Sequence, residues 1–492
     1  MTETKNKART GVSGLDDILA GGFSEGNVFL IEGEPGTGKT TLALQFLMQG
    51  GETSLYVALS ETEPELRTSA ASHGWSLPDS IHVVELTPQS LLDPEQEQSL
   101  LYASDLELGE ATKRIFEAFA EVKPKRLVID SLSEIRLLAQ GSLRYRRQLL
   151  AIKHFFARHQ ATVLLLDDLT SDIEDKTVHS IAHGVIRLEE LAPDYGAERR
   201  RLRVMKYRGQ KYRGGYHDFV IATGGIEVFP RLVAGESRTA QARWQIPTDS
   251  ASFNALLGGG IESGSSTLIL GPAGTGKSLI AISFAVAAIK RGERAALFIF
   301  DEELGLLMDR MRGLGIDLAS LQRDGRITIE QVDAAELSPG EFAHRVRRTV
   351  DAAGIKTVII DSLNGYQAAM PQEKALTLHI HELLQYLNRN GAATFMTVAQ
   401  RGITGDMNSP VDVTYLADTV ILLRYFEARG AVRRAISVIK KRSGAHEATI
   451  REFEISRQGL KIGEPLNGFQ GVLRGVPTFV GVGASLIGDS SA

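Results

Sequence analysis

One eight-residue segment occurs twice in this chain with the same glycine spacing. The first copy is GEPGTGKT at Gly33–Thr40 and the second is GPAGTGKS at Gly271–Ser278, with Lys277 lying 238 residues after Lys39. A period of 238 residues is far longer than a solenoid repeat. Each copy of the segment therefore predicts a domain that folds by itself. The chain has 492 residues, which also indicates at least two large domains.

Further landmarks recur in the same order and support a duplicated domain. The sequence predicts one domain over residues 1–235, a polar linker over 236–246, a second domain over 247–463 and a flexible, glycine-rich tail over 464–492. The recurring pairs are VIDS ending at Ser131 with IIDS ending at Ser362, Glu61 with Glu302, and Lys206–Arg208 with Lys440–Arg442.

Short aliphatic runs alternate with helical patterns in both copies. Continuous apolar strands separated by helices are typical of a parallel sheet that is covered on both faces, so the predicted class is α/β. Later segments such as Arg201–Met205 and Arg433–Ile439 alternate polar and apolar residues and predict antiparallel edge strands. The predicted parallel strands are Val28–Ile31, Ser54–Leu59, Ile81–Leu86, Leu127–Asp130 and Thr162–Leu166, then Thr267–Leu270, Ala296–Phe300, Ile327–Gln331, Val358–Asp361 and Ala393–Val398.

The repeated segment has the spacing G-x-x-x-x-G-K-[ST] of a phosphate-binding loop. Its glycines let backbone N–H groups converge on phosphate oxygens, and the following helix adds positive potential. We expect Lys39 and Lys277 to reach the β- and γ-phosphates of ATP. A glycine-rich turn with a chance lysine is the alternative. The expected ATP-binding residues are Gly33, Glu34, Pro35, Gly36, Thr37, Gly38, Lys39, Thr40 and Thr41, with Gly271, Pro272, Ala273, Gly274, Thr275, Gly276, Lys277, Ser278 and Leu279.

Two aspartates end buried strands in the segments RLVIDS and TVIIDS. Parallel sheets bind ligands at this end of their strands. We therefore expect Asp130 with the Thr40 hydroxyl, and Asp361 with the Ser278 hydroxyl, to hold Mg²⁺. An aspartate that only caps the following helix is the alternative.

Hydrolysis also requires a base that orients water against the γ-phosphate. Acidic residues follow the second predicted strand of each copy, as Ser60-Glu61 and as Asp301-Glu302-Glu303. Glu61 and Glu302 are the predicted bases, and Asp301, next to Glu302, is a further catalytic candidate. The alternative is a solvated acid at the start of a helix.

Two basic pairs, Lys206 with Arg208 and Lys440 with Arg442, have i, i+2 spacing, which places both side chains of a pair on one strand face. In a ring they would extend into a neighbouring subunit's ATP site, with the arginine as a transition-state cation. A basic strand face in water is the alternative.

Composition limits the partners. The net charge is −5, so the molecule as a whole does not attract nucleic acid, although eight cations gather between residues 199 and 213. There is no cysteine, the N-terminal MTETKNKART is polar and lacks the apolar run of a signal peptide, and no segment has the apolar length of a membrane span. We expect a cytoplasmic protein without a membrane partner.

From Thr10 to about Gly463 the chain resembles the KaiC family, a double-domain branch of the RecA-like ATPases. The resemblance lies in TGVSGLDDILAGGF before the first loop, in Ser60-Glu61-Thr62, in Lys206–Gly209, and in Lys440-Lys441-Arg442 with His446 four residues later. It implies two tandem RecA-like domains, a two-tiered homohexamer with ATP between subunits, and slow hydrolysis. His446 joins the expected ATP-binding residues on this ground.

The resemblance also implies Ser/Thr autophosphorylation by the second domain in clock-type members. Those members have paired glutamates after the second strand and adjacent Ser and Thr phosphoacceptors, whereas this chain has Ser60-Glu61 and Thr414-Tyr415. Thr414 is therefore the expected acceptor.

The leading hypothesis is a nucleotide-switched ring that uses ATP and Mg²⁺ and is read by signalling or clock-type regulatory proteins. The alternative is a DNA-dependent recombinase or helicase-type motor built on the same core.

Overall fold

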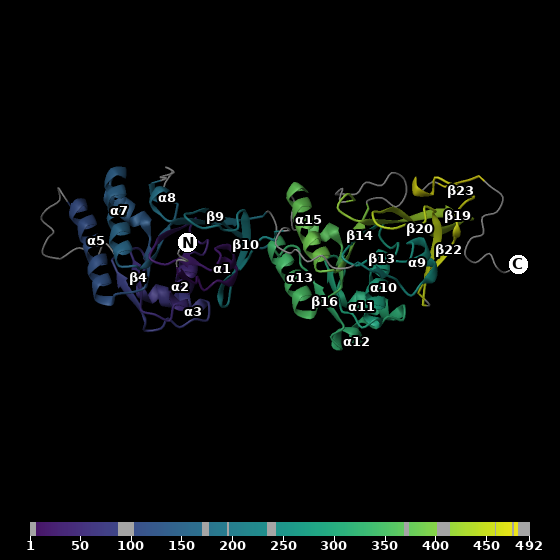
Figure 1. Ribbon diagram of the computed structural model, residues 1–492, viewed down its shortest axis with the longest axis horizontal. Helices are drawn as coiled ribbons and strands as arrows, with labels where there is room; N and C mark the ends of the chain where they lie inside the picture. The colour runs from purple at the N-terminus through teal and green to yellow at the C-terminus, as the bar shows by residue number, and fades with distance from the viewer. Residues whose placement is uncertain are drawn as a thin grey trace. The chain divides into compact units, whose positions relative to one another are not determined.

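The protein divides into two compact units, Met1–Arg231 and Leu232–Ala492. The computed structural model describes residues 6–86, 103–169, 177–193, 196–233, 243–368, 373–400, 414–457, 459–474 and 477–480. Each unit contains one nine-stranded sheet with helices packed against it (Figure 1). The predicted α/β class, with two tandem RecA-like domains, is confirmed.

The first sheet has the strand order β11-β10-β9-β8-β3-β7-β6-β4-β5. The six strands from β8 to β5 are parallel, and β9, β10 and β11 extend the sheet as antiparallel strands. The strands are β3 (Val28–Glu32), β4 (Ser54–Ala58), β5 (Ile81–Glu85), β6 (Arg126–Asp130), β7 (Thr162–Asp167), β8 (Gly184–Leu191), β9 (Arg199–Tyr207), β10 (Tyr216–Ala222) and β11 (Gly225–Phe229).

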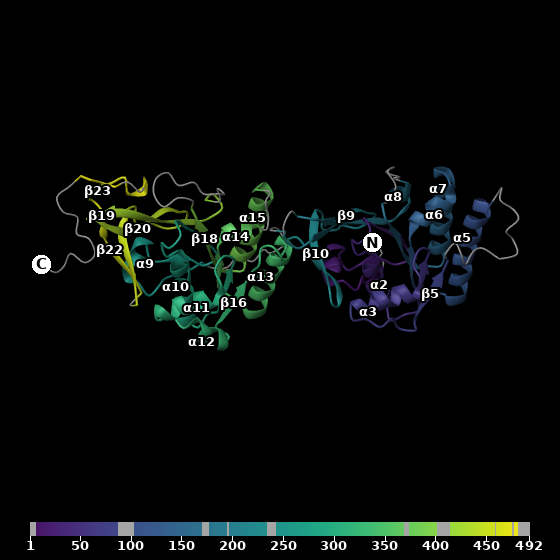
Figure 2. The ribbon, with the colours of Figure 1, turned by 180° about the vertical axis from the view of Figure 1, so that it is seen from behind.

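Helices cover both faces of the first sheet because successive strand residues point to opposite sides. Phe29 and Ile31 lie in the apolar cluster beneath α2 and α3, whereas Leu30 lies in the cluster beneath α5 and α7. Figure 2 shows the same unit from behind. The helices are α1 (Ser13–Ile18), α2 (Lys39–Gln49), α3 (Glu63–Ser72), α5 (Ala103–Val122), α6 (Leu132–Ala139), α7 (Ser142–Arg158) and α8 (Thr177–Ile181).

The second sheet has the order β16-β15-β17-β18-β14-β19-β20-β21-β22, which is the first order read from its other end. Each strand therefore has a counterpart in the first unit, as expected of a duplicated domain. The strands are β14 (Ser266–Gly271), β15 (Ala295–Ile299), β16 (Ile327–Gln331), β17 (Thr357–Asp361), β18 (Ala393–Ala399), β19 (Thr419–Ala428), β20 (Ala431–Lys441), β21 (Arg451–Ser456) and β22 (Gly459–Pro465).

Two helical layers also enclose the second sheet. Ile269 lies in the apolar cluster with α10 and α11, and Leu268 lies in the cluster with α13 and α15. The helices are α9 (Ala251–Leu256), α10 (Lys277–Lys290), α11 (Leu304–Gly313), α12 (Leu318–Arg323), α13 (Pro339–Ala353), α14 (Leu363–Ala368) and α15 (Glu373–Arg389).

Three two-stranded pairs and one 3-10 turn complete the described elements. They are β1 (Lys7–Ala8) with β2 (Phe23–Ser24), β12 (Gln245–Ile246) with β13 (Ile261–Glu262), β23 (Phe469–Gln470) with β24 (Thr478–Phe479), and the turn Val472–Arg474.

The parallel strands bring the candidate residues to one edge of each sheet. In the first unit β3 lies beside β7, and β6 lies between β7 and β4, so the loops that follow these strands meet. Within the described residues, no helix combines the length and the apolar character that crossing a bilayer requires.

Candidate functional site

The two phosphate-binding loops join a buried strand to a helix, as the sequence predicts. Helix α2 begins at Lys39 and α10 begins at Lys277, directly after Gly38 and Gly276. Those glycines have φ angles of 98° and 106°, a region that favours glycine. A Cβ at Gly276 would also lie 2.4 Å from the Ile455 side chain. The loop therefore depends on glycine both for its backbone conformation and for space.

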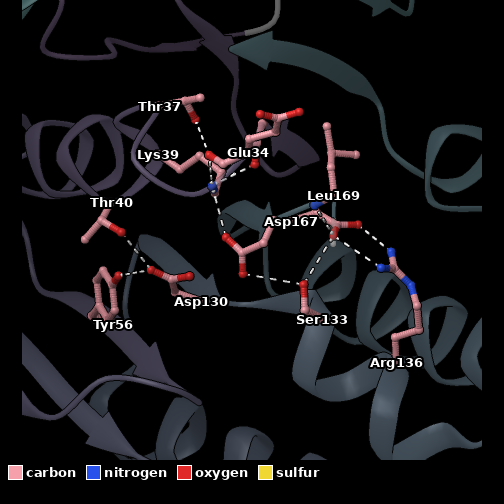
Figure 3. Close-up of polar contacts among 12 residues, drawn as sticks. Glu34, Thr37, Lys39, Thr40, Tyr56, Asp130, Ser133, Arg136, Asp167 and Leu169 are labelled. Atoms are coloured by element: carbon pink, nitrogen blue, oxygen red, sulfur yellow. Dashed lines mark hydrogen bonds and ion pairs between the residues drawn. The ribbon is translucent and has the colours of Figure 1, made fainter. Parts of the chain in front are cut away.

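The loop lysines lie inside their own loops. The Lys39 Nζ donates hydrogen bonds to the carbonyls of Gly33 at 2.7 Å and Glu34 at 2.9 Å (Figure 3). The Lys277 Nζ donates to the carbonyls of Gly271 at 2.9 Å and Pro272 at 2.8 Å. Both lysines are more than nine-tenths buried. The ammonium groups are thus fixed where a helix N-terminus and backbone amides already favour an anion.

In the first unit the predicted Mg²⁺ residues are in contact. The Thr40 hydroxyl donates to Asp130 Oδ2 at 3.1 Å, and Tyr56 donates to the same oxygen at 2.5 Å (Figure 3). Burial raises the pKa of the Asp130 carboxyl, and the nearby Asp168 raises it too, while the Tyr56 and Thr40 hydrogen bonds and the Lys39 charge oppose the rise. A hydroxyl and a carboxylate that meet beside the loop are the oxygen donors that Mg²⁺ prefers.

In the second unit the predicted Mg²⁺ residues have different partners. Asp361 Oδ1 accepts a hydrogen bond from the Thr397 hydroxyl, on the neighbouring strand β18. Ser278 is the second residue of α10, the same position that Thr40 holds in α2. No group of three or more His, Cys, Asp or Glu side chains among the described residues could hold a metal ion.

Glu61 is half-buried after β4, close to other acids. Burial raises the pKa of its carboxyl most, and the charges of Asp130, Glu65 and Asp168 raise it further. A carboxyl with a raised pKa has more affinity for a proton at neutral pH, which suits a general base.

The acids after β15 in the second unit have separate partners. The Ser362 hydroxyl donates to Asp301 Oδ2. Both carboxylate oxygens of Glu302 accept from the Arg310 guanidinium, at 3.1 and 2.5 Å. Glu303 caps α11 by accepting from the N–H groups of Gly305 and Leu306, which lower its pKa.

Of these three acids, Asp301 is the one that acts on the loop lysine. Burial lowers the pKa of Lys277, and the charges of Asp361 and Asp301 oppose that lowering. The structure therefore brings Asp301, Asp361 and Lys277 together and holds Glu302 on Arg310.

The predicted ring cations bind carbonyls of their own unit. The Lys206 Nζ donates to the carbonyls of His179 and of Ala182, the latter at 2.7 Å, and burial with the charges of Arg208 and Lys153 lowers its pKa to about 8. Lys440 does the same with Thr414 at 3.0 Å and Ala417 at 2.8 Å.

Arg208 and Arg442 are more exposed than the lysines beside them. Each donates to one carbonyl, of Ser180 at 2.7 Å and of Tyr415 at 2.6 Å. His446 is half-buried in the loop between β20 and β21. Thr414 is half-buried in the turn before β19. Lys440 binds the Thr414 carbonyl as Lys206 binds the His179 carbonyl, so Thr414 is the counterpart of His179.

Acids partly neutralise the cationic segment in β9. Arg200 pairs with Glu190 at 2.7 Å, and Arg201 pairs with Glu189 at 2.7 Å. Arg201 also lies 4.0 Å from the centre of the Tyr216 ring. These pairs weaken the case for a nucleic-acid surface, which needs cations that are available to phosphates.

Four residues at these sites were not anticipated from the sequence: Tyr56, Asp168, Arg310 and Thr397. Asp168 follows β7 directly, beside the strand that leads into the loop, so the rule that ligands bind at strand ends could have identified it. Tyr56 and Thr397 lie within strands, and Arg310 lies eight residues after Glu302. No spacing rule assigns those three to the site.

A doubled α/β sheet that carries a phosphate-binding loop and a strand-end aspartate in each half defines a tandem P-loop ATPase. The family model described as "ATPase: KaiC" matches residues 8–233 and 246–467. The chain belongs to this family, and KaiC-like ATP binding and ATPase activity follow from that membership.

Several curated relatives align along nearly the whole chain. The circadian clock protein KaiC3 of Synechocystis sp. is 26% identical, over 97% of this chain and 96% of the relative. The circadian clock oscillator protein KaiC of Parathermosynechococcus lividus is 27% identical, over 97% of this chain and 89% of the relative. The circadian clock oscillator protein KaiC of Thermostichus vulcanus is 28% identical, over 97% of this chain and 92% of the relative. These comparisons do not favour a DNA motor.

Proposed function

We propose that each unit binds Mg²⁺·ATP at its own loop and hydrolyses it, and that the chain works as a nucleotide-switched homohexamer. The observation that carries the proposal is that, in both units, a buried loop lysine lies close enough to a strand-end aspartate for their charges to interact, Lys39 with Asp130 and Lys277 with Asp361. ATP would bind through the loop amides, with Lys39 or Lys277 at the β- and γ-phosphates.

Mg²⁺ would be held by Thr40 and Asp130 in the first unit and by Ser278 and Asp361 in the second, where it would neutralise phosphate charge. The 3.1 Å contact between Thr40 and Asp130 supports this assignment. Tyr56 and Thr397 orient the aspartates through hydrogen bonds.

The base differs between the units in this proposal. Glu61 would take the proton of the attacking water in the first unit, which its raised pKa supports. In the second unit Asp301 would have this role, since Arg310 holds the Glu302 carboxylate.

Assembly into a ring would place Arg208 and Arg442 at the ATP of the next subunit. Their exposure supports this role. Lys206 and Lys440 bind carbonyls of the segments 179–182 and 414–417, which the two arginines also contact. Head-to-tail contacts of this kind close into a ring when the rotation from one subunit to the next closes. Signalling or clock-type proteins would read the nucleotide state of the ring.

Autophosphorylation of Thr414 is the finer part of the proposal. Thr414 is half-buried in the turn before β19, and Lys440 fixes its backbone carbonyl. A hydroxyl on this turn would receive the γ-phosphoryl group of ATP and lose its proton to an acid of the site.

The test is incubation of the full chain with Mg²⁺ and γ-labelled ATP, following free phosphate and protein-bound label. Lys39→Ala or Lys277→Ala alone should leave one working unit, and the double variant should lose nucleotide binding. Thr414→Ser should keep any label and Thr414→Val should lose it. Undiminished ATP affinity in the double variant would refute the proposal.

A further inference from the structure

The Lys39 ammonium has a carboxylate partner that the reaction does not require. The Lys39 Nζ lies 3.0 Å from Asp168 Oδ1, and the Asp168 side chain is 27% exposed. Lys39 is also the residue that would bind the β- and γ-phosphates. Any phosphate that reaches this ammonium therefore approaches a fixed negative charge.

The position of Asp168 is set by its neighbours. Asp167, the residue before it, is buried and pairs with Arg136 at 2.5 Å (Figure 3). Leu169, the residue after it, has a φ of 55° and donates its N–H to Asp167 Oδ1 at 3.4 Å. Ser133 contacts Asp168 Oδ2 at 3.4 Å. The carboxylate is thus held beside Lys39 by the fold around it.

The second unit has no acid at this position. Glu32 pairs with Asp167 across β3 and β7, and Leu270 pairs with Val398 across β14 and β18. Glu32 and Leu270 each precede the first glycine of their loop, so Ala399 is the counterpart of Asp168. Asn364, the counterpart of Ser133, binds the Ala399 backbone, with its amide nitrogen 3.1 Å from the carbonyl and its Oδ1 2.7 Å from the N–H. The strand position is therefore shared, but the second unit has a methyl group there instead of a carboxylate, and Val398 stands where the first unit has Asp167.

The charge of Asp168 affects the pKa of two nearby acids. Asp168 contributes to the raised pKa of Glu61 and of Asp130, after burial as the largest cause in each case. A γ-phosphate bound at Lys39 would enter the same acidic cluster. ADP has no γ-phosphate, so its terminal β-phosphate would lie further from the acidic cluster.

We infer that Asp168 sets the nucleotide preference of the first unit by weakening ATP binding relative to ADP, while Ala399 brings no such charge to the loop of the second unit. The physical basis is repulsion between like charges at a partly buried site. The inference rests on the proposed binding of nucleotide at Lys39.

The experiment compares Mg²⁺·ATP and Mg²⁺·ADP affinities by calorimetry in full-length chains with one loop disabled. In the Lys277→Ala chain, Asp168→Ala should tighten ATP binding about tenfold and ADP binding by less than about threefold, a tenfold change being about 1.4 kcal/mol. Asp168→Asn, which keeps the size of the side chain, should behave like Asp168→Ala.

The reciprocal change is made in the Lys39→Ala chain. Ala399→Asp should weaken ATP binding about tenfold, and the neutral control Ala399→Asn should leave the ratio of ATP to ADP affinity unchanged. Similar losses with both substitutions would mean that size alone acts, and would overturn the inference.

Two results separate this inference from the proposed function. If the Lys277→Ala chain binds nucleotide and neither Asp168 variant changes the ATP to ADP ratio, the inference is wrong while the binding site stands. If that chain binds neither nucleotide with or without Asp168, both the first binding site and the inference fail.

Discussion

The Arg310 guanidinium donates hydrogen bonds to both carboxylate oxygens of Glu302, at 3.1 and 2.5 Å. This two-point contact fixes the orientation of the Glu302 carboxylate toward Arg310. Asp301, one residue earlier, acts electrostatically on Lys277 and accepts a hydrogen bond from Ser362.

The first prediction follows from this division. In a Lys39→Ala chain, Asp301→Asn should lower ATP hydrolysis by the second unit about 100-fold, because a general base contributes about that much. Glu302→Gln should lower it by less than about fivefold, a smaller share of the same contribution. Single-turnover phosphate release distinguishes the two variants. A larger loss with Glu302→Gln would reverse the assignment.

The second prediction concerns pH and the first unit. The pKa of Glu61 is raised, chiefly by burial and then by Asp130, Glu65 and Asp168. A raised pKa means that the carboxyl binds a proton at a higher pH. As the pH is lowered, hydrolysis should therefore begin to fall at a pH above 4.5, the ordinary glutamate pKa. The pH profile of kcat in a Lys277→Ala chain checks this.

Glu65→Gln provides the matched control for that profile. Glutamine can keep the contacts with Thr62 that cap α3, yet it removes one of the charges that raise the Glu61 pKa. The acid limb should therefore move to lower pH. An unmoved limb would exclude Glu65 as a cause, and a limb that survives Glu61→Gln would exclude Glu61 as the titrating group.

The third prediction concerns the groups that hold the aspartates. Tyr56→Phe removes the 2.5 Å hydrogen bond to buried Asp130 and should destabilise the first unit by about 1–3 kcal/mol. Because that bond lowers the Asp130 pKa, its loss should raise the pKa and weaken Mg²⁺·ATP binding at slightly acidic pH. Chemical denaturation and calorimetry measure the two effects. Thr397→Val is the equivalent change at Asp361.

The fourth prediction separates two roles for the basic pairs. Lys206→Met and Lys440→Met remove donors to two carbonyls each and should cost about 1–3 kcal/mol of stability. Arg208→Ala and Arg442→Ala should change stability less and reduce hydrolysis in the assembled ring. Denaturant unfolding and sedimentation with ATP test this, and exposed Lys211→Met is the control. Unchanged stability in the lysine variants would contradict the assignment.

The sequence predicts the fold well because its signals are local. The strand Val28–Ile31, the glycines at Gly38 and Gly276, and the aspartates at Asp130 and Asp361 each follow from a short pattern, and the structure has these strands and loop glycines in the predicted places. The assignments of individual residues to ATP, Mg²⁺ and catalysis, and the domain limits at 235, 247 and 463, stay predictions.

What the sequence could not predict depends on contacts across strands and between helices. Nothing near Glu302 in the sequence indicates that Arg310, eight residues later on α11, would bind it. Asp168 reaches Lys39 only because β7 lies next to β3 in the sheet, although 129 residues separate the two in the chain. Tyr56 reads as an ordinary apolar strand residue, and its hydroxyl acquires a role only when β4 and β6 pair.

The identical strand order of the two sheets makes the chain its own reference system. Any side chain on one nine-stranded scaffold can be exchanged for the residue that evolution placed at the matching point of the other, with buffer, concentration and polypeptide held constant. Differences that separate two enzymes elsewhere can here be transplanted within one molecule and read in a single sample.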